Sequence, residues 1–276
     1  MDQVNRIPVE EWKEKKQAER EQVYEEQNTA LKEVCASGAS LFSYLTGHGR
    51  LGSAVSVGNA ALVLKQFPNA RAVMSMKGWN EYGRRISKGA KGIRVLAKSG
   101  KYMVVDRVFE VSQTHGDRPY QNYELDQDPK NLQTAILAMQ QLSRVPLHSE
   151  QDEIATRYDA ASDSIIVASG AVPSETMQQL SAALVGSYIA HQDERPSEDV
   201  SRLYSTAVAL EVCGRFGVKP QDVSAQLDEG LSLIPSGRER QFLSEVREFA
   251  LAIGNHIEHH LPQRNKAPVR SPHTRG

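Results

Sequence analysis

The chain of 276 residues lacks several features that mark specialised classes of protein. It has only two cysteines, Cys35 and Cys213, which are far apart and match neither a metal-binding spacing nor a disulfide framework. No charged and then apolar leader opens the chain, and no apolar run approaches the roughly 20 residues that a membrane span needs. The formal net charge is only -1, and there is no internal repeat. These absences predict a soluble cytoplasmic protein without a membrane partner.

The near-neutral total hides a strong local excess of positive charge. Between Lys65 and Arg107 the chain has eleven basic residues and two acidic ones, while the N-terminal segment and the stretch after Glu124 are acidic. Local potential matters more to binding than the total charge does. A run of charges is usually a solvated face, but an imbalance this large predicts an anionic partner.

The segment 77–93 concentrates this pattern, with five cations, two aromatic residues and four glycines. Lysine and arginine neutralise phosphates, ring faces stack on bases, and glycines let backbone N–H groups approach an anion closely. Trp79 and Tyr82 are three residues apart, so they suit either packing with Ile86 on one helix face or stacking on bases. The segment predicts a nucleic-acid-binding surface.

Hydrophobic spacing predicts an α+β fold, in which N-terminal helices and a small antiparallel sheet precede a mostly helical half. Polar residues with glycine and proline between Gln113 and Asp128 predict a boundary between two halves that fold separately. The expected units are a charged helix at 1–33, a basic domain at 34–118, a helical domain at 129–261 and a flexible basic tail at 262–276.

Local patterns predict the individual elements. Gly47-His48-Gly49 is expected to end a helix that includes Leu31 and Leu45, and Asp128 with Pro129 to begin another. Ser236 and Glu239 have the spacing of a capping box. Further helices are expected at about 55–66, around Trp79, and at 174–191, 197–216 and 236–260; strands are expected at 72–74 and 164–167, with a hairpin at 93–97 and 102–111.

Several short motifs occur in order between about residues 40 and 115: Phe42-Ser43-Tyr44, Gly58-Asn59-Ala60-Ala61-Leu62, Gln66-Phe67-Pro68-Asn69-Ala70, Gly78-Trp79, Gly83-Arg84-Arg85, Lys88-Gly89, Lys91-Gly92-Ile93 and the closing stretch Val108-Phe109-Glu110-Val111-Ser112-Gln113-Thr114. This part of the chain resembles the N-terminal single-stranded-DNA-binding domain of the ArdC antirestriction family, and equally the related LtrC-type proteins of conjugative elements. Several motifs with consistent spacing are more specific than any one alone.

The resemblance implies a compact α+β domain that binds single-stranded DNA with little sequence preference. Together with the charge pattern, it gives the following expected DNA contacts: Asn59, Lys77, Trp79, Tyr82, Arg84, Arg85, Lys88, Lys91 and Arg94.

In that family a zinc-metallopeptidase-like domain with His-Glu-x-x-His on one helix often follows. The second half of this chain resembles such a domain, but Ser187 and Tyr188 stand at the expected His and Glu positions, and only His191 is kept. On the helix that would give the third ligand, Tyr204 and Thr206 hold the plausible positions. Catalytic zinc needs about three protein ligands and a carboxylate base. We therefore expect a non-catalytic pseudo-peptidase without metal or cofactor.

Two clusters suggest chemistry but have plainer explanations. His256 and His260 are spaced to share a metal, with His259 beside them, yet histidines are also favoured in the last turn of a helix. Ser187, Tyr188 and His191 lack an orienting acid or an oxyanion donor. Neither cluster is expected to be a site.

Three functions stay open from the sequence. The first is a non-catalytic single-stranded-DNA-binding protein of a plasmid or integrative element, acting in DNA transfer or protection. The second is a metallopeptidase with an unconventional ligand set. The third is an interaction module whose C-terminal domain recruits a protein partner and whose basic face is incidental.

Overall fold

The computed structural model describes residues 8–151 and 155–262. The helices in this part of the chain are α1 Val9–Val34, α2 Gly38–Leu51, α3 Val57–Gln66, α4 Met76–Tyr82, α5 Pro129–Gln140, α6 Pro173–Ala190, α7 Glu198–Phe216, α8 Ser224–Leu231 and α9 Glu239–His260. The predicted basic tail lies outside the described residues except for Pro262. No helix of the described ranges is long and apolar enough to cross a membrane.

The strands form three small sheets. Their bounds are β1 Val73–Ser75, β2 Arg85–Ile86, β3 Ile93–Ser99, β4 Tyr102–Glu110, β5 Thr114–His115, β6 Leu147–Glu150, β7 Arg157–Asp159 and β8 Ser164–Ala168. The first sheet is antiparallel in the order β1-β4-β3, and β2 pairs with β5. In the third, β8 lies between β6, to which it is parallel, and β7, to which it is antiparallel. The predicted α+β class is confirmed.

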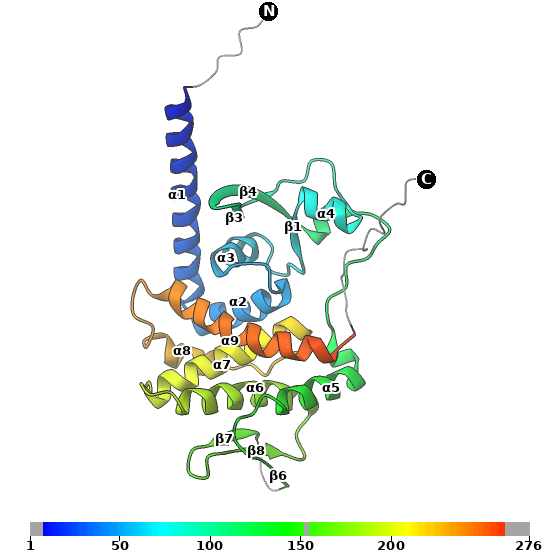
Figure 1. The fold of residues 1–276 in the computed structure, drawn as a ribbon, viewed down its shortest axis with the longest axis vertical. Coiled ribbons are helices and arrows are strands. Elements are labelled where there is room, and N and C mark those ends of the chain that lie inside the picture. Colours follow the sequence, from blue (N-terminus) through cyan, green and yellow to red (C-terminus); the bar gives the residue numbers. More distant parts are fainter. Residues whose placement is uncertain (1–7, 152–154, 263–276) are drawn as a thin grey trace, which may run out of the picture.

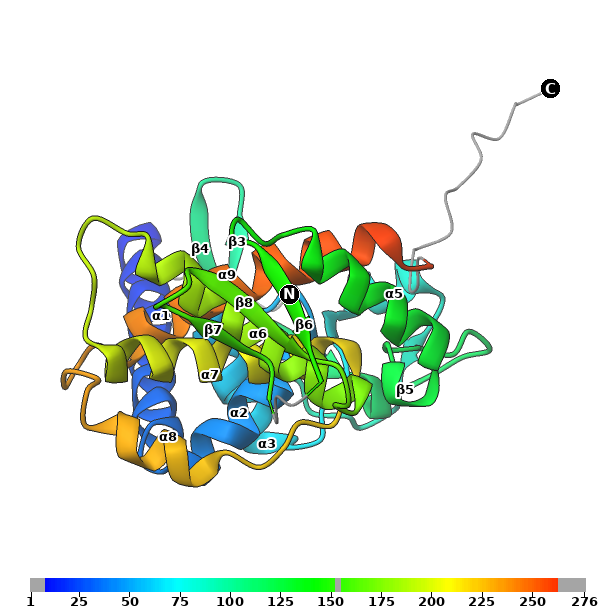
Figure 2. The same cartoon turned by 90° about the horizontal axis from the view of Figure 1, so that it is seen from below.

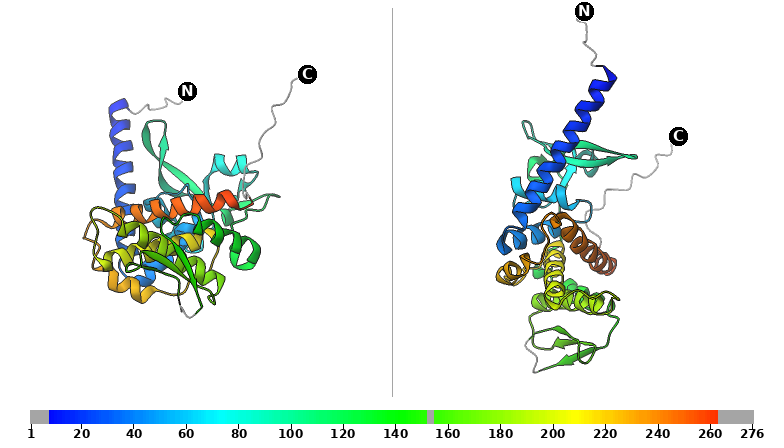
Figure 3. Two further views of the ribbon diagram at one scale, coloured as in Figure 1. Left: turned by 60° about the horizontal axis from the view of Figure 1, so that its bottom comes forward. Right: turned by 90° about the vertical axis from the view of Figure 1, so that its left-hand side faces the viewer.

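A layer of helices, α5, α6, α7 and α9, lies across the middle of the molecule (Figure 1). The sheet β6-β8-β7 covers the far side of α6 (Figure 2), where both β7 and β8 contact that helix. On the opposite side of the layer, α2 and α3 lie beneath the β1-β4-β3 sheet and α4 (Figure 1). The N-terminal half of α1 extends away from the body beside the β3-β4 hairpin (Figure 3).

Many of the expected elements are confirmed. Asp128 caps α5 by accepting a hydrogen bond from the backbone N–H of Asn131, with Pro129 at the first position. The predicted hairpin is β3 and β4, paired from Ile93 opposite Val108 to Ser99 opposite Tyr102. The capping box at Ser236 was wrong, because α9 begins at Glu239.

Helix α2 corrects the prediction that Gly47-His48-Gly49 ends a helix. It continues to Leu51 because these glycines serve contact between helices. A Cβ on Gly49 would lie 2.0 Å from the carbonyl oxygen of Glu211 in α7, and one on Gly214 would lie 2.1 Å from that of Thr46. The backbones of α2 and α7 therefore touch at a distance that only glycine permits.

The expected division into two separately folding halves stays a prediction, but the packing of the structure does not separate them. One hydrophobic core includes Leu41 and Leu45 of α2 together with Leu210 of α7 and Val246 of α9. The predicted boundary segment is packed as well: Leu125 is fully buried, and the ring of Tyr123 lies 5.3 Å from that of Phe216 between centroids. We therefore expect one cooperative unfolding transition and no proteolytic joint between 113 and 128.

A buried polar cluster ties α2, α7 and α9 together. The side chain of Glu211 lies 3.4 Å from His48 Nδ1 and 3.6 Å from Arg247 Nη1. Burial lowers the pKa of Arg247, and the neighbouring Glu211 carboxylate acts in the opposite direction. Removing one partner of such a buried charge pair leaves the other uncompensated. The junction of the two halves is thus polar as well as apolar.

The glycine contact gives a prediction for stability. Gly214→Ala is expected to lower the free energy of unfolding by about 1–3 kcal/mol, because the new methyl group forces α2 away from α7. Gly186→Ala in α6 is the matched control, since its Cβ would meet nothing nearer than 3.7 Å. That control should be neutral or stabilising by up to about 1 kcal/mol. Urea unfolding followed by circular dichroism measures both, and equal stability of the two variants would contradict the packing described.

Candidate nucleic-acid interface

The basic segment forms a loop that is anchored at several points. Helix α4 ends at Gly83, whose φ of 95° is left-handed, and β2 follows. The N–H of Ser87 donates to the carbonyl of Gln113 (2.8 Å), and Gln113 Nε2 donates to the carbonyl of Lys91 (2.9 Å). The loop therefore has a defined shape although much of it is exposed.

Three predicted contacts, Arg85, Lys88 and Lys91, are exposed on this loop. Gly89 lies between the two lysines with a φ of 82°, and a Cβ there would meet nothing within 4 Å. The backbone at this turn is open to an approaching anion, as the glycine pattern predicts. Gly92 is different, because its Cβ would lie 2.9 Å from the ring of Phe109, so packing explains that glycine.

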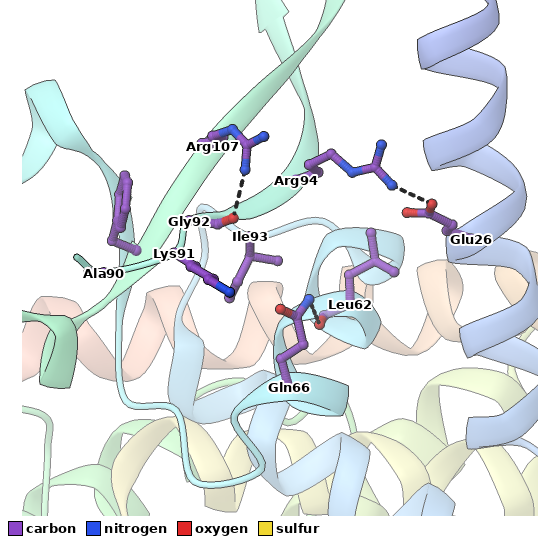
Figure 4. A pocket seen from close by; sticks show the side chains of 10 residues that line it. Glu26, Leu62, Gln66, Ala90, Lys91, Gly92, Ile93, Arg94 and Arg107 are labelled. Carbon is purple, nitrogen blue, oxygen red and sulfur yellow. Dashed lines mark hydrogen bonds and ion pairs between the residues drawn. The ribbon is translucent and has the colours of Figure 1, made fainter.

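Beside the loop is a hollow of about 740 Å³ between α1, α3 and the first sheet (Figure 4). Lys91, Arg94 and Arg107 contribute to its lining. Arg94 forms an ion pair with Glu26 of α1, and Arg107 donates to the carbonyl of Gly92 (3.1 Å). Three cations and a single carboxylate therefore line this hollow, which suits a phosphate better than a cation.

Arg107 is a lining residue that the motif analysis did not single out. It lies directly opposite Arg94 in the hairpin register. Residues directly opposite on antiparallel strands project from the same face of the sheet. Once the strands of the predicted hairpin are put in register, Arg94 and Arg107 lie side by side, and this placement was the signal for Arg107.

The two aromatic residues of the segment are buried, which favours packing over stacking. Trp79 is 0% exposed, and its Nε1–H donates to the carbonyl of Phe109 (2.8 Å). The Tyr82 hydroxyl donates to the carbonyl of Pro119 (3.0 Å). Both rings contact Tyr120, whose pKa is raised by burial. Trp79 and Tyr82 are thus core residues of this fold, and their contact with DNA stays a prediction.

The guanidinium of Arg84 is occupied by protein acceptors, and its contact with DNA stays a prediction. Nε donates to Thr114 Oγ1 (2.7 Å), Nη2 to the Thr114 carbonyl (2.9 Å) and Nη1 to the Arg118 carbonyl (2.8 Å). These bonds hold the segment after β5 against the start of β2. Arg84 positions the loop from which Arg85 projects.

The roles of Arg84 and Arg85 can be separated by matched substitutions. Arg84→Gln is expected to cost about 1–3 kcal/mol of stability, because carbonyl groups lose their donors. Arg85→Gln should change stability by less than about 0.5 kcal/mol, since this exposed side chain is remote from the core. Thermal unfolding of the two variants measures the difference. Equal losses would show that the bonds of Arg84 are not specific.

The side-chain amide of Asn59 is also occupied by protein partners. Its Nδ2 donates to the carbonyl of Leu96 (2.8 Å), and its Oδ1 accepts from the N–H of Leu96 (3.0 Å) and from Gln27 Nε2 (2.7 Å). The amide therefore continues the hydrogen bonding of β3 and joins it to α3 and α1. Lys77 is exposed at the start of α4, with its Nζ 3.9 Å from a Glu81 oxygen, and lies outside the lining of the hollow.

The peptidase-like positions of the second half lie around the end of α6. The Ser187 hydroxyl donates to the carbonyl of Leu184 (2.9 Å), and Tyr188 is partly exposed. His191 lies 2.7 Å from the Ser187 carbonyl and 3.3 Å from Asp163, and these two partners raise the pKa of His191. Burial raises the pKa of Tyr204, and the hydrogen bond that its hydroxyl donates to Glu245 raises that pKa further.

These residues do not fit a catalytic metal. Across residues 8–151 and 155–262, no group of three or more His, Cys, Asp or Glu side chains could hold a metal ion. The last turn of α9 favours the plainer explanation of its histidines: His259 Nδ1 lies 2.7 Å from the Asn255 carbonyl and His260 Nδ1 lies 3.0 Å from that of His256. No catalytic step is derived from either cluster.

A second hollow, of about 620 Å³, lies beside Tyr188 and Phe249 among α6, α9 and the segment that follows α5. Its lining is largely apolar, with Arg144, His191 and Glu248 among the polar groups. The expected protein partner of the C-terminal half stays a prediction.

No family model matches this chain, and no curated protein matches it in sequence. The fold, with its small sheets around a layer of helices, is of the kind found in ArdC-like antirestriction proteins. The metal-free crystal structure of antirestriction protein ArdC from plasmid R388 aligns with a TM-score of 0.55 and 14% identity, covering 86% of this chain and 99% of that chain. Its Mn(II)-bound structure gives a TM-score of 0.49 at 14% identity, over 76% and 86% of the two chains. The resemblance seen in the motifs is thus confirmed at the level of the fold.

Proposed function

We propose that this protein binds single-stranded DNA without catalysing a reaction on it. It acts in the cytoplasm for a plasmid or another mobile element, in DNA transfer or in protection against restriction. The observation that carries the proposal is the anchored basic loop, where Arg85, Lys88 and Lys91 are exposed beside the hollow that Arg94 and Arg107 line.

The geometry of the loop favours a nucleic-acid backbone over a small anion. Its cations are spread over a loop and two strands, so a flexible polyanion can satisfy several of them at once. The turn at Gly89 is open, so an extended nucleic-acid backbone can approach the same surface closely. The antirestriction part of the proposal is supported by the ArdC-like fold, since R388 ArdC is an antirestriction protein.

Binding of a fluorescent oligothymidylate to the full-length chain tests the proposal. The logarithm of the affinity should fall linearly with the logarithm of salt, by roughly 0.7 for each phosphate contact. A duplex of the same length should compete more weakly. The loop lies beside a hollow, whereas a duplex is read by a convex element such as a helix that enters its groove. Absence of binding at low salt would refute the DNA part, and equal competition by the duplex would refute the preference for single strands.

The non-catalytic part has its own test in the metal content. Protein purified, chelated and then incubated with zinc is expected to hold no stoichiometric ion at the end of α6, because Ser187 and Tyr188 replace a ligand and a base. Elemental analysis measures the zinc. About one tightly held ion per chain, lost on His191→Ala, would favour the metallopeptidase alternative instead.

A further inference from the structure

Helix α1 has one face with two different characters along its length. In its C-terminal half this face is buried through Val23, Gln27, Ala30 and Leu31. Helical spacing continues the same face toward the N-terminus through Trp12, Lys13, Lys16 and Arg20. Beyond its packing partners, the core-facing side of the helix is therefore cationic with one aromatic ring.

The opposite face of α1 carries the negative charge. Glu10, Glu14, Glu21 and Glu25 are spaced so that they share one side of the helix. One further acid, Glu19, accepts a hydrogen bond from Lys16 (2.7 Å) at the edge of the cationic face. Most of the cations in the N-terminal half of the helix thus lie on the side directed toward β4, while Glu26, further along α1, pairs with Arg94 of the hairpin.

A cleft of about 410 Å³ lies between this cationic face and strand β4. Its lining consists of Trp12, three cations, a glutamine and the two valines Val104 and Val105, and it includes no carboxylate. Figure 1 and Figure 3 show the extended part of α1 beside the hairpin. Trp12 is 53% exposed, so its ring is available at the mouth of the cleft.

The tip of the hairpin adds groups of the same kind. Tyr102 is 63% exposed, and the Nζ of Lys101 lies 5.3 Å from the centre of its ring. Lys98 and Met103 are exposed on the same tip. An exposed aromatic ring beside a lysine is the pairing that the buried Trp79 and Tyr82 do not provide.

We propose that the cleft between α1 and β4 is a second binding surface for single-stranded nucleic acid, with Trp12 stacking on a base and Lys13, Lys16 and Arg20 contacting phosphates. This inference rests on the proposed function and extends it. A cation-lined cleft without a carboxylate in its lining suits a polyanion, and exposed rings favour one that carries bases.

The cleft is placed so that one strand can occupy both surfaces. The hollow beside the basic loop includes Glu26 of α1 and Arg107 of β4, while the cleft includes Arg20 and Val105 of the same two elements. Arg20 and Glu26 are separated by about 9 Å along the helix. The stacking ring absent from the basic loop is therefore supplied by the cleft, which lies between the same two elements.

The intrinsic fluorescence of the full-length protein tests this inference directly. The chain has two tryptophans, and Trp79 is fully buried. Oligothymidylate is expected to quench the emission of Trp12, and Trp12→Phe should remove that quenching while leaving the signal of Trp79. Trp12→Ala should weaken binding roughly 5- to 100-fold, as expected for the loss of one stacked base.

The charges are tested by a matched pair of double variants. Lys16→Gln/Arg20→Gln should flatten the salt slope by roughly 1.4, corresponding to two phosphate contacts. Lys15→Gln/Lys32→Gln removes two exposed cations from other sides of α1 and should leave the slope unchanged. Far-UV circular dichroism of each variant shows whether α1 is still formed.

The outcomes separate this inference from the proposed function. Binding by fluorescence anisotropy without quenching of Trp12, and with parental affinity in Trp12→Ala, would overturn the cleft and leave the basic loop as the site. Absence of all oligonucleotide binding would overturn both. Equal quenching and competition by polyglutamate of matched length would show a surface for acidic chains in general and overturn the assignment to nucleic acid.

Discussion

Replacing Arg85, Lys88 and Lys91 together by glutamine is expected to flatten the salt slope of single-stranded-DNA binding by about 2, because three phosphate contacts are lost at roughly 0.7 each. The parent should bind more tightly than the variant, and the ratio of the two affinities should fall about 20-fold between 50 and 200 mM salt. The three side chains are exposed and the loop is held by other residues, so the variant should keep the stability of the parent. Anisotropy titrations at several salt concentrations measure the slope.

A control variant of equal charge change distinguishes contact from net charge. Lys130, Arg195 and Lys219 are exposed in the C-terminal half, away from the loop. Their joint replacement by glutamine changes the net charge by the same amount and should leave the slope near that of the parent. If both triple variants behave alike, only the overall field acts on the DNA. If neither differs from the parent, the loop is not a binding site.

The sequence predicted elements well where periodicity alone determines them. The β3-β4 hairpin, α5 with its Asp128 cap, and α9 with Phe242, Val246 and Ile257 on one buried side were all recognisable from spacing and capping. These patterns are local, and a local pattern needs no knowledge of what packs against it. Helix α8 and strands β6 and β7 were missed, because they are short and their form depends on their neighbours.

The errors share one physical cause, which is contact between residues far apart in the sequence. Gly49 is of the residue type that often ends a helix, but here it allows close packing against the backbone of Glu211. The segment 113–128 has the composition of a linker, yet Leu125 lies in the core that both halves share. Glycine and polar residues serve flexible loops and close packing alike. Composition therefore could not distinguish the two.

The candidate site also divides into features that are local in sequence and features that depend on distant contacts. The sequence identified the basic loop, and its exposed cations stand where a strand can reach them. It could not identify which cations are occupied, because the partners of Arg84 are backbone carbonyls of a segment some thirty residues away. Trp12 was overlooked for a related reason: its neighbours in sequence are charged residues of both signs on a helix, and a cleft forms only where the hairpin lies against its face of α1.

Trp79→Ala is expected to have the largest effect on stability, because it removes a fully buried tryptophan. Loss of such a side chain typically costs about 3–5 kcal/mol. Trp79 belongs to a small cluster with Ala72 and Tyr82 that is separate from the main core. The loss should therefore appear first as local opening, with hydrogen exchange of α4 amides accelerated before that of α7.

Trp79→Phe is the matched control for this effect. It retains a ring against Tyr82, but it leaves the carbonyl of Phe109 without its indole donor, which should cost about 1–3 kcal/mol. For both variants, the loss of DNA affinity should follow the fraction of α4 that has opened, and the salt slope should not change. A Trp79→Ala protein with parental hydrogen exchange but binding weakened by about 1–3 kcal/mol would contradict a purely structural role for Trp79. The ring would then leave its cluster to stack on a base, and the buried position would be the DNA-free state of the site.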